Sequence, residues 1–112
     1  MKHSLNIVMK KAIDVYHSFL VHPTIGESAR EYLKSRGLNE HHIDKYQLGY
    51  SPDDWQNLSE LSNNHHNKKL LIDAGLLIEK ENGHSYSRFR NRVMFPIHDR
   101  VGRPIAFGAR TM

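Results

Sequence analysis

Read as extended backbone, the side chains of residues 88–99 alternate between two faces, one of them apolar, as in a β-strand with one buried face. The apolar set on one face is Phe89, Val93, Phe95 and Ile97, and arginines occupy the other. The alternation stops at residues 99–103 and resumes at 105, which is typical of a hairpin whose loop ends in glycine. The sequence therefore predicts a three-residue loop over 100–102, with Gly102 in the left-handed conformation.

This loop also predicts a register for the two strands. The expected pairs are Asp99 with Arg103, Ile97 with Ile105, Phe95 with Phe107, and Arg92 with Arg110. Phe95 and Phe107 should then be buried cross-strand neighbours, with Arg92, Arg110, Ala106 and Gly108 together on the opposite face. The small residues there would let a phosphate or a base approach the backbone closely.

The residues alone leave two interpretations of this arginine face open. Two guanidinium groups that face each other are unfavourable unless an anion lies between them, which favours an anion-binding site. The alternative is an edge hairpin whose charges only resist aggregation. Residues 88–110 hold six arginines and one acid, and the whole chain has a formal net charge of +4. Such a charge is compatible with a polyanionic partner but does not require one.

Length and composition limit the class of protein. A chain of 112 residues is expected to form a single domain, 1–112, too short for a core plus a second catalytic fold. There is no cysteine, which excludes disulfides and thiolate zinc sites. No apolar run approaches membrane-spanning length and the N-terminus does not resemble a signal peptide. We therefore expect a soluble cytoplasmic protein with no membrane partner.

Apolar spacing and capping residues predict about five short helices followed by a small, mainly antiparallel sheet that ends in a β-hairpin, an α+β fold. Expected helices cover residues 5–20, 24–36 with a capping box of Thr24 and Glu27, 39–46 with Asn39 as N-cap, 51–61 starting at Ser51 and Pro52, and 67–74. Glycines at 37, 49 and 75 are expected to end the second, third and fifth. Residues 76–80 and 86–92 should be extended, with a tight turn at 81–83.

Other polar residues offer no recognisable catalytic or metal site. Asp53 and Asp54 invite a metal hypothesis, but acids at the start of a helix are better explained by the macrodipole. The adjacent histidines at 41–42 and 65–66 are poorly placed to chelate one ion, so structural or solvated roles are expected. Trp55 is interpreted as a core or helix-start anchor rather than a base-stacking platform. No catalytic residue and no metal ligand is assigned.

The arginine-rich segment also carries a family resemblance. Residues 88–99 (RFRNRVMFPIHD), followed by 102–110 (GRPIAFGAR), resemble a stretch of DnaG-type bacterial DNA primases, in the subdomain that immediately precedes their TOPRIM fold. Upstream, residues 29–38, 48–55 and 74–78 resemble the same subdomain in the same order. The resemblance covers nearly the whole chain, from about Tyr16 onward.

This resemblance implies part of a DNA primase, a DNA-directed RNA polymerase and nucleotidyltransferase that makes RNA primers for DNA replication within the primosome. The subdomain would form a basic wall of the cleft that binds single-stranded DNA template and nucleotide triphosphates. The motif positions assign phosphate contacts to Arg36, Arg88, Arg90 and Arg110, and the pairing argument adds Arg92. Implied partners are the RNA–DNA hybrid, the TOPRIM domain and the replicative helicase.

The sequence also departs from the family. It ends at Met112, before the acidic metal-binding residues of TOPRIM, and lacks the zinc-binding domain that normally comes first. Ala106 and Ala109 stand where the family usually has glycine. No cofactor is therefore expected in this chain, and Mg²⁺ would be held by the TOPRIM domain of a full primase, so the fragment should be inactive alone. The alternatives are a stand-alone, non-enzymatic single-stranded nucleic-acid-binding module or a protein-docking module.

Overall fold

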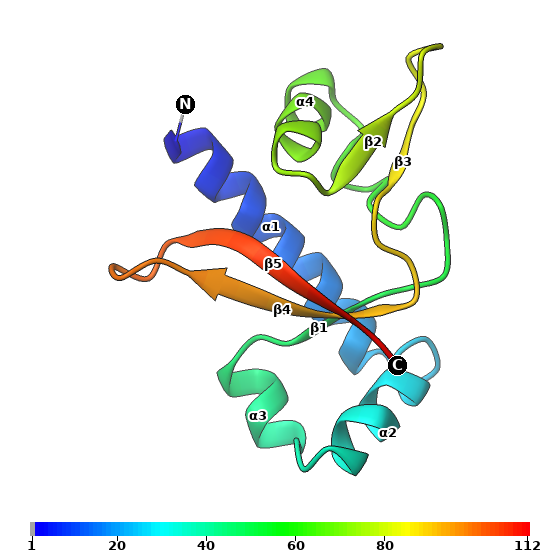
Figure 1. The fold of residues 1–112 in the computed structure, drawn as a ribbon, viewed down its shortest axis with the longest axis vertical. Coiled ribbons are helices and arrows are strands. Elements are labelled where there is room, and N and C mark those ends of the chain that lie inside the picture. The colour runs from blue at the N-terminus through cyan, green and yellow to red at the C-terminus, as the bar shows by residue number, and fades with distance from the viewer. Residues whose placement is uncertain (1) are drawn as a thin grey trace.

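A three-stranded antiparallel sheet lies at the centre of the molecule, with helices on both of its faces (Figure 1). The computed structural model describes residues 2–112, with side chains from Leu5 onward. The sheet has the order β1 (Gly49–Ser51), β4 (Arg92–His98), β5 (Pro104–Thr111). The helices are α1 (Lys2–Val21), α2 (Glu27–Ser35), α3 (Glu40–Lys45) and α4 (His65–Asp73). A separate two-stranded hairpin pairs β2 (Leu77–Glu79) with β3 (Ser85–Ser87).

The first half of the central strand β4 is buried on both faces, so the molecule has two hydrophobic cores. Met94 belongs to the α1 core, which α1 forms with α4, β2 and the loop before α4. Val93 belongs to the α2–α3 core, where the end of α1, α2, α3 and β1 meet. Both side chains are fully buried although consecutive strand residues point to opposite faces. The sheet is therefore a shared wall between two cores rather than a one-sided cover.

Helix α1 packs closely onto β1 because the strand has a glycine at the crossing point. A Cβ at Gly49 would lie 2.5 Å from Tyr16 Cβ and 2.9 Å from the Tyr16 carbonyl carbon. Tyr16 is buried, and its ring meets Phe107 of β5 edge-on with centroids 5.3 Å apart. The glycine thus sets the distance between the longest helix and the sheet.

Four of the five expected helices are confirmed, with differences at their ends. Asn39 caps α3 as expected, its side chain accepting the His41 and His42 N–H groups. The capping box proposed for α2 is wrong, since Gly26 is the N-cap and makes no side-chain cap bond. Gly37 after α2, Gly75 after α4 and Gly83 in the turn at 81–83 have positive φ. This conformation is common for glycine at helix ends.

The expected helix over residues 51–61 is wrong. Ser51 is the last residue of β1 and pairs with Arg92, and residues 55–63 form successive turns. Asn57 is buried, and its side chain hydrogen-bonds Ser51, Pro52, Ser87 and Phe89. These tertiary hydrogen bonds override the local signal of a Ser-Pro helix start. The extended segment expected at 86–92 is also broken, because β3 ends at Ser87 and Asn91 has a φ of 55°.

The hairpin loop is confirmed, but the register beyond it is shifted by one residue. Asp99 N–H donates to Arg103 O at 2.9 Å, and Gly102 has a φ of 83°. His98 faces Pro104, but Ile97 faces Ala106, so Ile105 is an extra residue in a β-bulge. The shift reverses the faces of β5 beyond that point.

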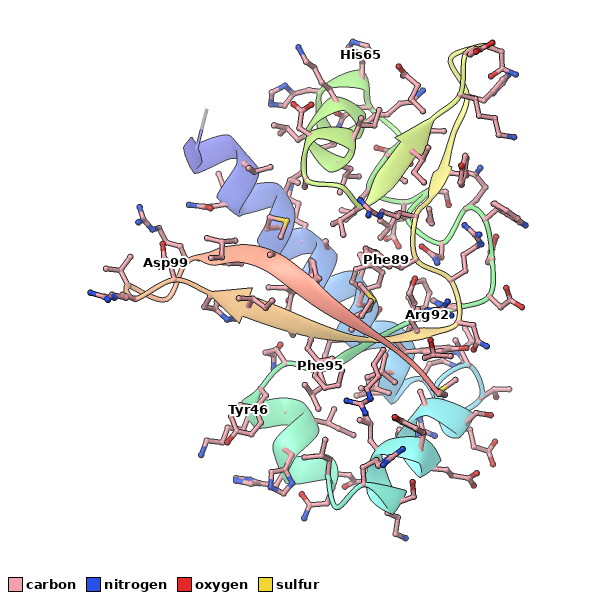
Figure 2. All side chains as sticks on the ribbon, in the orientation of Figure 1. Tyr46, His65, Phe89, Arg92, Phe95 and Asp99 are labelled. Atoms are coloured by element: carbon pink, nitrogen blue, oxygen red, sulfur yellow. The ribbon has the colours of Figure 1, made fainter. Side chains whose placement is uncertain are left out.

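Three predicted pairs are therefore wrong. Phe95 lies opposite Gly108, Phe107 opposite Pro96, and Arg92 opposite Thr111. Phe95 packs against the α2–α3 core and Phe107 against the α1 core, and both are only partly buried. Figure 2 shows Phe89 and Phe95 on opposite sides of the hairpin, with Arg92 at one end and Asp99 at the loop.

The contact between Tyr16 and Gly49 provides a test of this packing. Gly49→Ala should lower the free energy of unfolding by about 1–3 kcal/mol, because the methyl group must displace the α1 backbone. Gly108→Ala is the matched control in the same sheet, where the new Cβ would meet Phe95 Cβ at 3.8 Å. Its effect should stay within about 0.5 kcal/mol. Urea unfolding followed by circular dichroism measures both, and equal effects would contradict the close-approach argument.

Candidate nucleic-acid interface

Three arginines converge on one polar hollow where the chain enters β4. The hollow, of ≈ 500 Å³, is lined by Asp53 and by the segment Arg88–Arg92, here called the arginine segment. Residues 88–91 do not form a regular strand. The arginines at 88, 90 and 92 therefore do not share one face of a flat strand, as the sequence predicted. The positive φ of Asn91 turns the backbone just before β4 begins. The sequence thus correctly predicted that these three residues lie together, but it wrongly predicted an extended backbone for them.

A buried polar network fixes the backbone of the arginine segment. Asn57 Nδ2 donates to Ser51 Oγ at 2.8 Å and to the Pro52 carbonyl at 3.0 Å. Ser87 Oγ donates to Asn57 Oδ1 at 2.6 Å, and Ser51 Oγ donates to the Phe89 carbonyl at 2.6 Å. Each of the three side chains is buried. Since a satisfied buried network admits few alternative arrangements, the arginine segment is held in one conformation.

Backbone contacts extend this support on either side of the network. Ser87 N–H donates to the Trp55 carbonyl at 2.7 Å, and Arg88 N–H donates to the Leu76 carbonyl at 3.0 Å. At the other end, Tyr50 Oη donates to Asn91 Oδ1 at 3.0 Å. Burial, and then the negative charge of Asp53, raise the pKa of Tyr50, so its hydroxyl remains a neutral donor at physiological pH. The segment is therefore anchored along its length.

Arg90 is the most constrained of the three arginines. Its Nη1 donates to the Ser87 carbonyl at 2.6 Å. Its Cζ lies 3.5 Å from the centroid of the Trp55 ring and 5.8 Å from that of Tyr86. Trp55 and Tyr86 meet edge-on at 5.2 Å. The guanidinium is thus stacked on an aromatic pair, a geometry that orients its remaining N–H donors.

Arg88 and Arg92 complete the cationic lining. Arg92 Nη1 donates to the Arg90 and Asn91 carbonyls at 3.0 and 3.1 Å. Arg88 is exposed. Within the described residues, the ion pairs join His17 to Asp44 and Arg103 to Asp99, so the three guanidinium groups have no carboxylate partner. Their positive charge is left for a ligand or for solvent.

Arg36 and Arg110 lie outside this hollow. Arg110 faces Val93 across the hairpin and is exposed on the sheet face of the α2–α3 core, whereas Arg92 is on the other face. Arg36 follows α2, is exposed, and stacks over the ring of Tyr32 with 5.5 Å from Cζ to the centroid. The structure therefore brings together Arg88, Arg90 and Arg92 but not all five predicted residues. The pairing of Arg92 with Arg110 was wrong because of the bulge.

Sequence reasoning missed two residues of this site. Trp55 was interpreted as a core or helix-start anchor, yet its side chain is 57% exposed and stacks on Arg90. Asp53 was interpreted as a helix-start acid, yet no helix starts there and it lines the hollow. Both errors come from the single wrong prediction of a helix at 51–61. The sequence gives no signal of the long-range hydrogen bonds that replace that helix.

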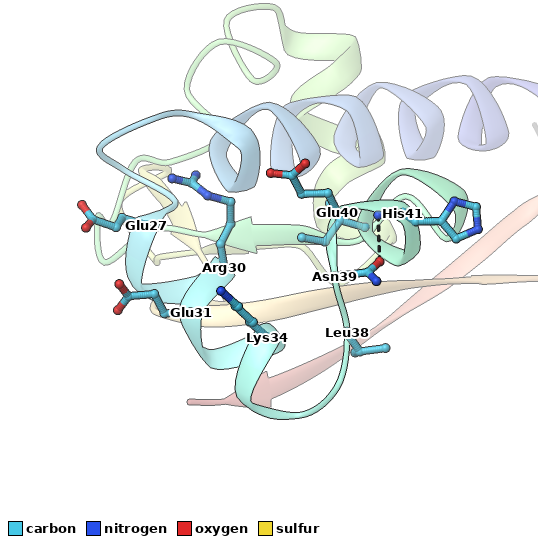
Figure 3. A pocket seen from close by; sticks show the side chains of 9 residues that line it. Glu27, Arg30, Glu31, Lys34, Leu38, Asn39, Glu40 and His41 are labelled. Carbon is cyan, nitrogen blue, oxygen red and sulfur yellow. Dashed lines mark hydrogen bonds between the residues drawn. The ribbon is translucent and has the colours of Figure 1, made fainter.

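A second hollow, between α2 and α3, contains none of the predicted site residues (Figure 3). It has a volume of ≈ 560 Å³ and a mixed lining in which Glu27, Glu31 and Glu40 accompany Arg30 and Lys34. Arg30 is already engaged, because its Nη1 donates to the Leu20 and His22 carbonyls at 2.7 and 2.6 Å. This arginine caps the end of α1, so the hollow has no excess of free positive charge.

Two further findings concern the residues that the structure describes, 2–112. No group of three or more His, Asp or Glu side chains is close enough to hold a metal within this range. Within the same range, no helix is both long enough and apolar enough to cross a membrane.

Comparison with known proteins identifies the family. The geometry defines a small α+β domain with a polar hollow lined by three arginines and one acid. The family model for the DNA primase catalytic core, N-terminal domain, matches residues 15–112, and the chain belongs to this family. It is 45% identical over 112 residues to the DNA primase of Salmonella typhimurium and 41% identical over 98 residues to that of Geobacillus stearothermophilus. These alignments cover 99% and 87% of this chain but only 19% and 16% of those proteins.

Solved structures show the same fold. A DnaG primase catalytic domain bound to single-stranded DNA superposes with a TM-score of 0.89 at 41% identity, over 98% of this chain and 36% of that one. The catalytic core of the Escherichia coli primase gives a TM-score of 0.86 at 42% identity, over 96% and 34%. The predicted α+β class and the predicted family are therefore confirmed. The chain corresponds to about one third of each of these catalytic cores.

The network around Asn57 can be tested by removing its amide. Asn57→Ala leaves the Ser87 hydroxyl and the Pro52 carbonyl without their side-chain partner, so the free energy of unfolding should fall by about 2–4 kcal/mol. Gln56→Ala is the neighbouring control, because that exposed side chain makes one hydrogen bond, to the Ser85 carbonyl. It should cost less than about 1 kcal/mol. Urea unfolding compares the two, and a mild effect at Asn57 would show that the network does not hold the segment.

Proposed function

We propose that this chain is the N-terminal part of the catalytic core of a DNA primase, and that its arginine hollow binds the phosphates of single-stranded template and of incoming nucleotide triphosphates. The observation that carries the proposal is the convergence of three unpaired guanidinium groups on one hollow with a rigid backbone. Because the chain belongs to the primase family, we take these phosphates to be those of nucleic acid and nucleotides.

The chemistry of the hollow suits phosphate better than it suits other anions. Arginine presents a planar fork that binds two phosphate oxygens at once, and stacking of Arg90 on Trp55 reduces the freedom that binding would cost. An exposed tryptophan beside cationic groups is also the pattern of single-strand binding, where bases stack on aromatic rings. Phosphate contacts and a stacking surface thus lie side by side in this proposal.

Arg36 and Arg110 are proposed as separate phosphate contacts on the other face of the sheet. Since they do not line the hollow, they would hold a different stretch of the strand or of the RNA–DNA hybrid. We assign the metal chemistry to the TOPRIM domain of a full primase, where Mg²⁺ would stabilise charge on the reacting phosphates. The replicative helicase as partner, the cytoplasmic location and the single domain spanning 1–112 belong to the same proposal.

A stand-alone single-strand-binding module is the second candidate. The sequence argued against such a module, because the aromatic residues near the arginines were expected to face the core. In the structure Trp55 is exposed and stacked on Arg90, which favours the module. Both candidates predict binding through the same surface. They differ in whether the domain supports primer synthesis when combined with the TOPRIM portion of a related primase.

Binding to a labelled single-stranded oligonucleotide tests the arginine hollow. The affinity should fall with salt concentration, with a log–log slope of about −0.7 for each phosphate contact. Arg88→Ala should weaken binding and make this slope shallower by about 0.7, since it removes one contact. Fluorescence anisotropy over a range of salt concentrations gives both quantities.

Arg100→Ala is the matched control, because Arg100 is exposed in the hairpin loop and does not line the hollow. It changes the net charge by the same amount and should leave the slope unchanged. Thermal melts should show both variants folded, as exposed charges usually alter stability by no more than about 0.5 kcal/mol. If the two variants lose the same affinity, the effect is one of net charge, and the hollow is not the binding surface.

Primer synthesis tests the assignment of the chemistry. The 112-residue chain alone should make no RNA on single-stranded DNA with Mg²⁺ and nucleotide triphosphates, because its described residues offer no metal-binding group. The measurement is incorporation of labelled nucleotide on a defined template, with a complete primase as positive control. Template-dependent RNA made by this chain alone would overturn the division of labour proposed here.

A further inference from the structure

One carboxylate stands among the guanidinium groups of the arginine hollow and is not paired with any of them. Asp53 lines the hollow together with Arg88, Arg90 and Arg92. The ion pairs among the described residues do not include Asp53, so no arginine nitrogen lies within salt-bridge distance of its carboxylate. A site for a simple anion has no use for this group, because its charge opposes that of the ligand. A ligand that contacts every charged group of the hollow would therefore offer hydrogen-bond donors as well as anionic groups.

We propose that Asp53 recognises the sugar hydroxyl groups of a ribonucleotide whose phosphates lie on Arg88, Arg90 and Arg92. This inference rests on the proposed function, since it takes the arginine hollow as the phosphate site. An ionised carboxylate only accepts hydrogen bonds, so it selects ligands that offer donors. The sugar hydroxyls are the donors closest to the phosphates and are common to all four ribonucleotides. Carboxylates serve ribose in this way in dinucleotide-binding folds.

The backbone around Asp53 is fixed, although its side chain is exposed. The carbonyl of the preceding Pro52 accepts from Asn57 Nδ2 at 3.0 Å and from Asp54 N–H at 2.8 Å. Asp54 Oδ1 in turn accepts from the Gln56 N–H at 2.9 Å. The same buried network therefore anchors both the backbone next to Asp53 and the backbone of the arginine segment. Because both backbones are anchored, a ligand that contacts both kinds of group loses less freedom on binding.

The surroundings of Asp53 agree with a position inside the site. Its charge contributes to the raised pKa of Tyr50, whose hydroxyl donates to Asn91 of the arginine segment. Asp53 also lines the hollow together with Arg92, the first residue of β4. The hollow, at ≈ 500 Å³, is within the range of about 300–1,000 Å³ found for small-molecule sites. The hollow is therefore of a size that suits a small ligand such as a nucleotide.

The first experiment compares ligands on the wild-type chain. ATP, 2′-deoxy-ATP, 3′-deoxy-ATP and inorganic triphosphate are titrated at low salt by calorimetry, with the fluorescence of Trp55, the single tryptophan, as a second signal. ATP should bind roughly 3- to 10-fold more tightly than at least one of the deoxy forms, the range expected for one hydrogen bond to an exposed charged group. Equal binding of ATP and both deoxy forms would overturn the proposal.

The second experiment removes the carboxylate. Asp53→Ala should bring the ratio of ATP to deoxy-ATP affinity close to one, and Asp53→Asn should bind inorganic triphosphate roughly 2- to 5-fold more tightly, because a repulsive charge is gone. Asp54→Asn is the matched control: it makes the same change of charge at the adjacent position, does not line the hollow, and keeps an amide oxygen for the Gln56 N–H. It should retain the wild-type ratio.

The two levels of the argument fail differently. If inorganic triphosphate binds but Asp53→Ala keeps the wild-type discrimination, Asp53 does not recognise the sugar, and the arginine hollow remains a phosphate site. If neither triphosphate nor any nucleotide binds to the wild-type chain, the phosphate assignment fails, and the role of Asp53 fails with it. Loss of discrimination in Asp54→Asn as well would show a general effect of charge and would also overturn the proposal.

Discussion

The side-chain amide of Asn57 is the interaction on which the site depends. It is buried, it comes from a turn rather than a helix, and it joins the end of β1, the loop after it and the end of β3. Leaving any one of these polar groups unpaired in the interior would cost about 1–3 kcal/mol, so the network holds together as a unit. Through it, two segments far apart in the sequence form the walls of one hollow.

Much of the fold was predictable because it is encoded locally. The apolar spacing of α1, the Asn39 cap of α3 and the Gly102 turn each depend on residues within one or two turns of chain. Such signals survive in the folded protein wherever no distant group competes for the same backbone. Arg88, Arg90 and Arg92 were found for the same reason, since their spacing is a property of one short segment.

The errors lie where distant parts of the chain decide the structure. The bulge at Ile105 reverses the faces of β5. Because successive strand residues point to opposite faces, this single extra residue makes the predicted neighbour wrong at every later position. Ser51 and Pro52 are a sound helix start in isolation, yet Ser51 pairs with Arg92 in the sheet. Trp55 and Asp53 were misplaced with that helix, so the sequence identified the arginines of the hollow and missed its acidic residue and the aromatic ring stacked on Arg90.

The two cores explain how the site can be both rigid and charged. Val93 and Met94 of β4 are buried in the two cores on opposite faces of the sheet. The start of β4, which directly follows the arginine segment, therefore cannot shift to relieve repulsion among the guanidinium groups. These groups stay near the surface, where like charges cost little in water, and stability comes instead from Asn57 and the packed strand. Residues that hold the hollow and residues that contact a ligand are therefore largely different sets. Binding can then change by substitution of Arg88 without loss of the fold, whereas the shape of the hollow depends on residues that no ligand touches.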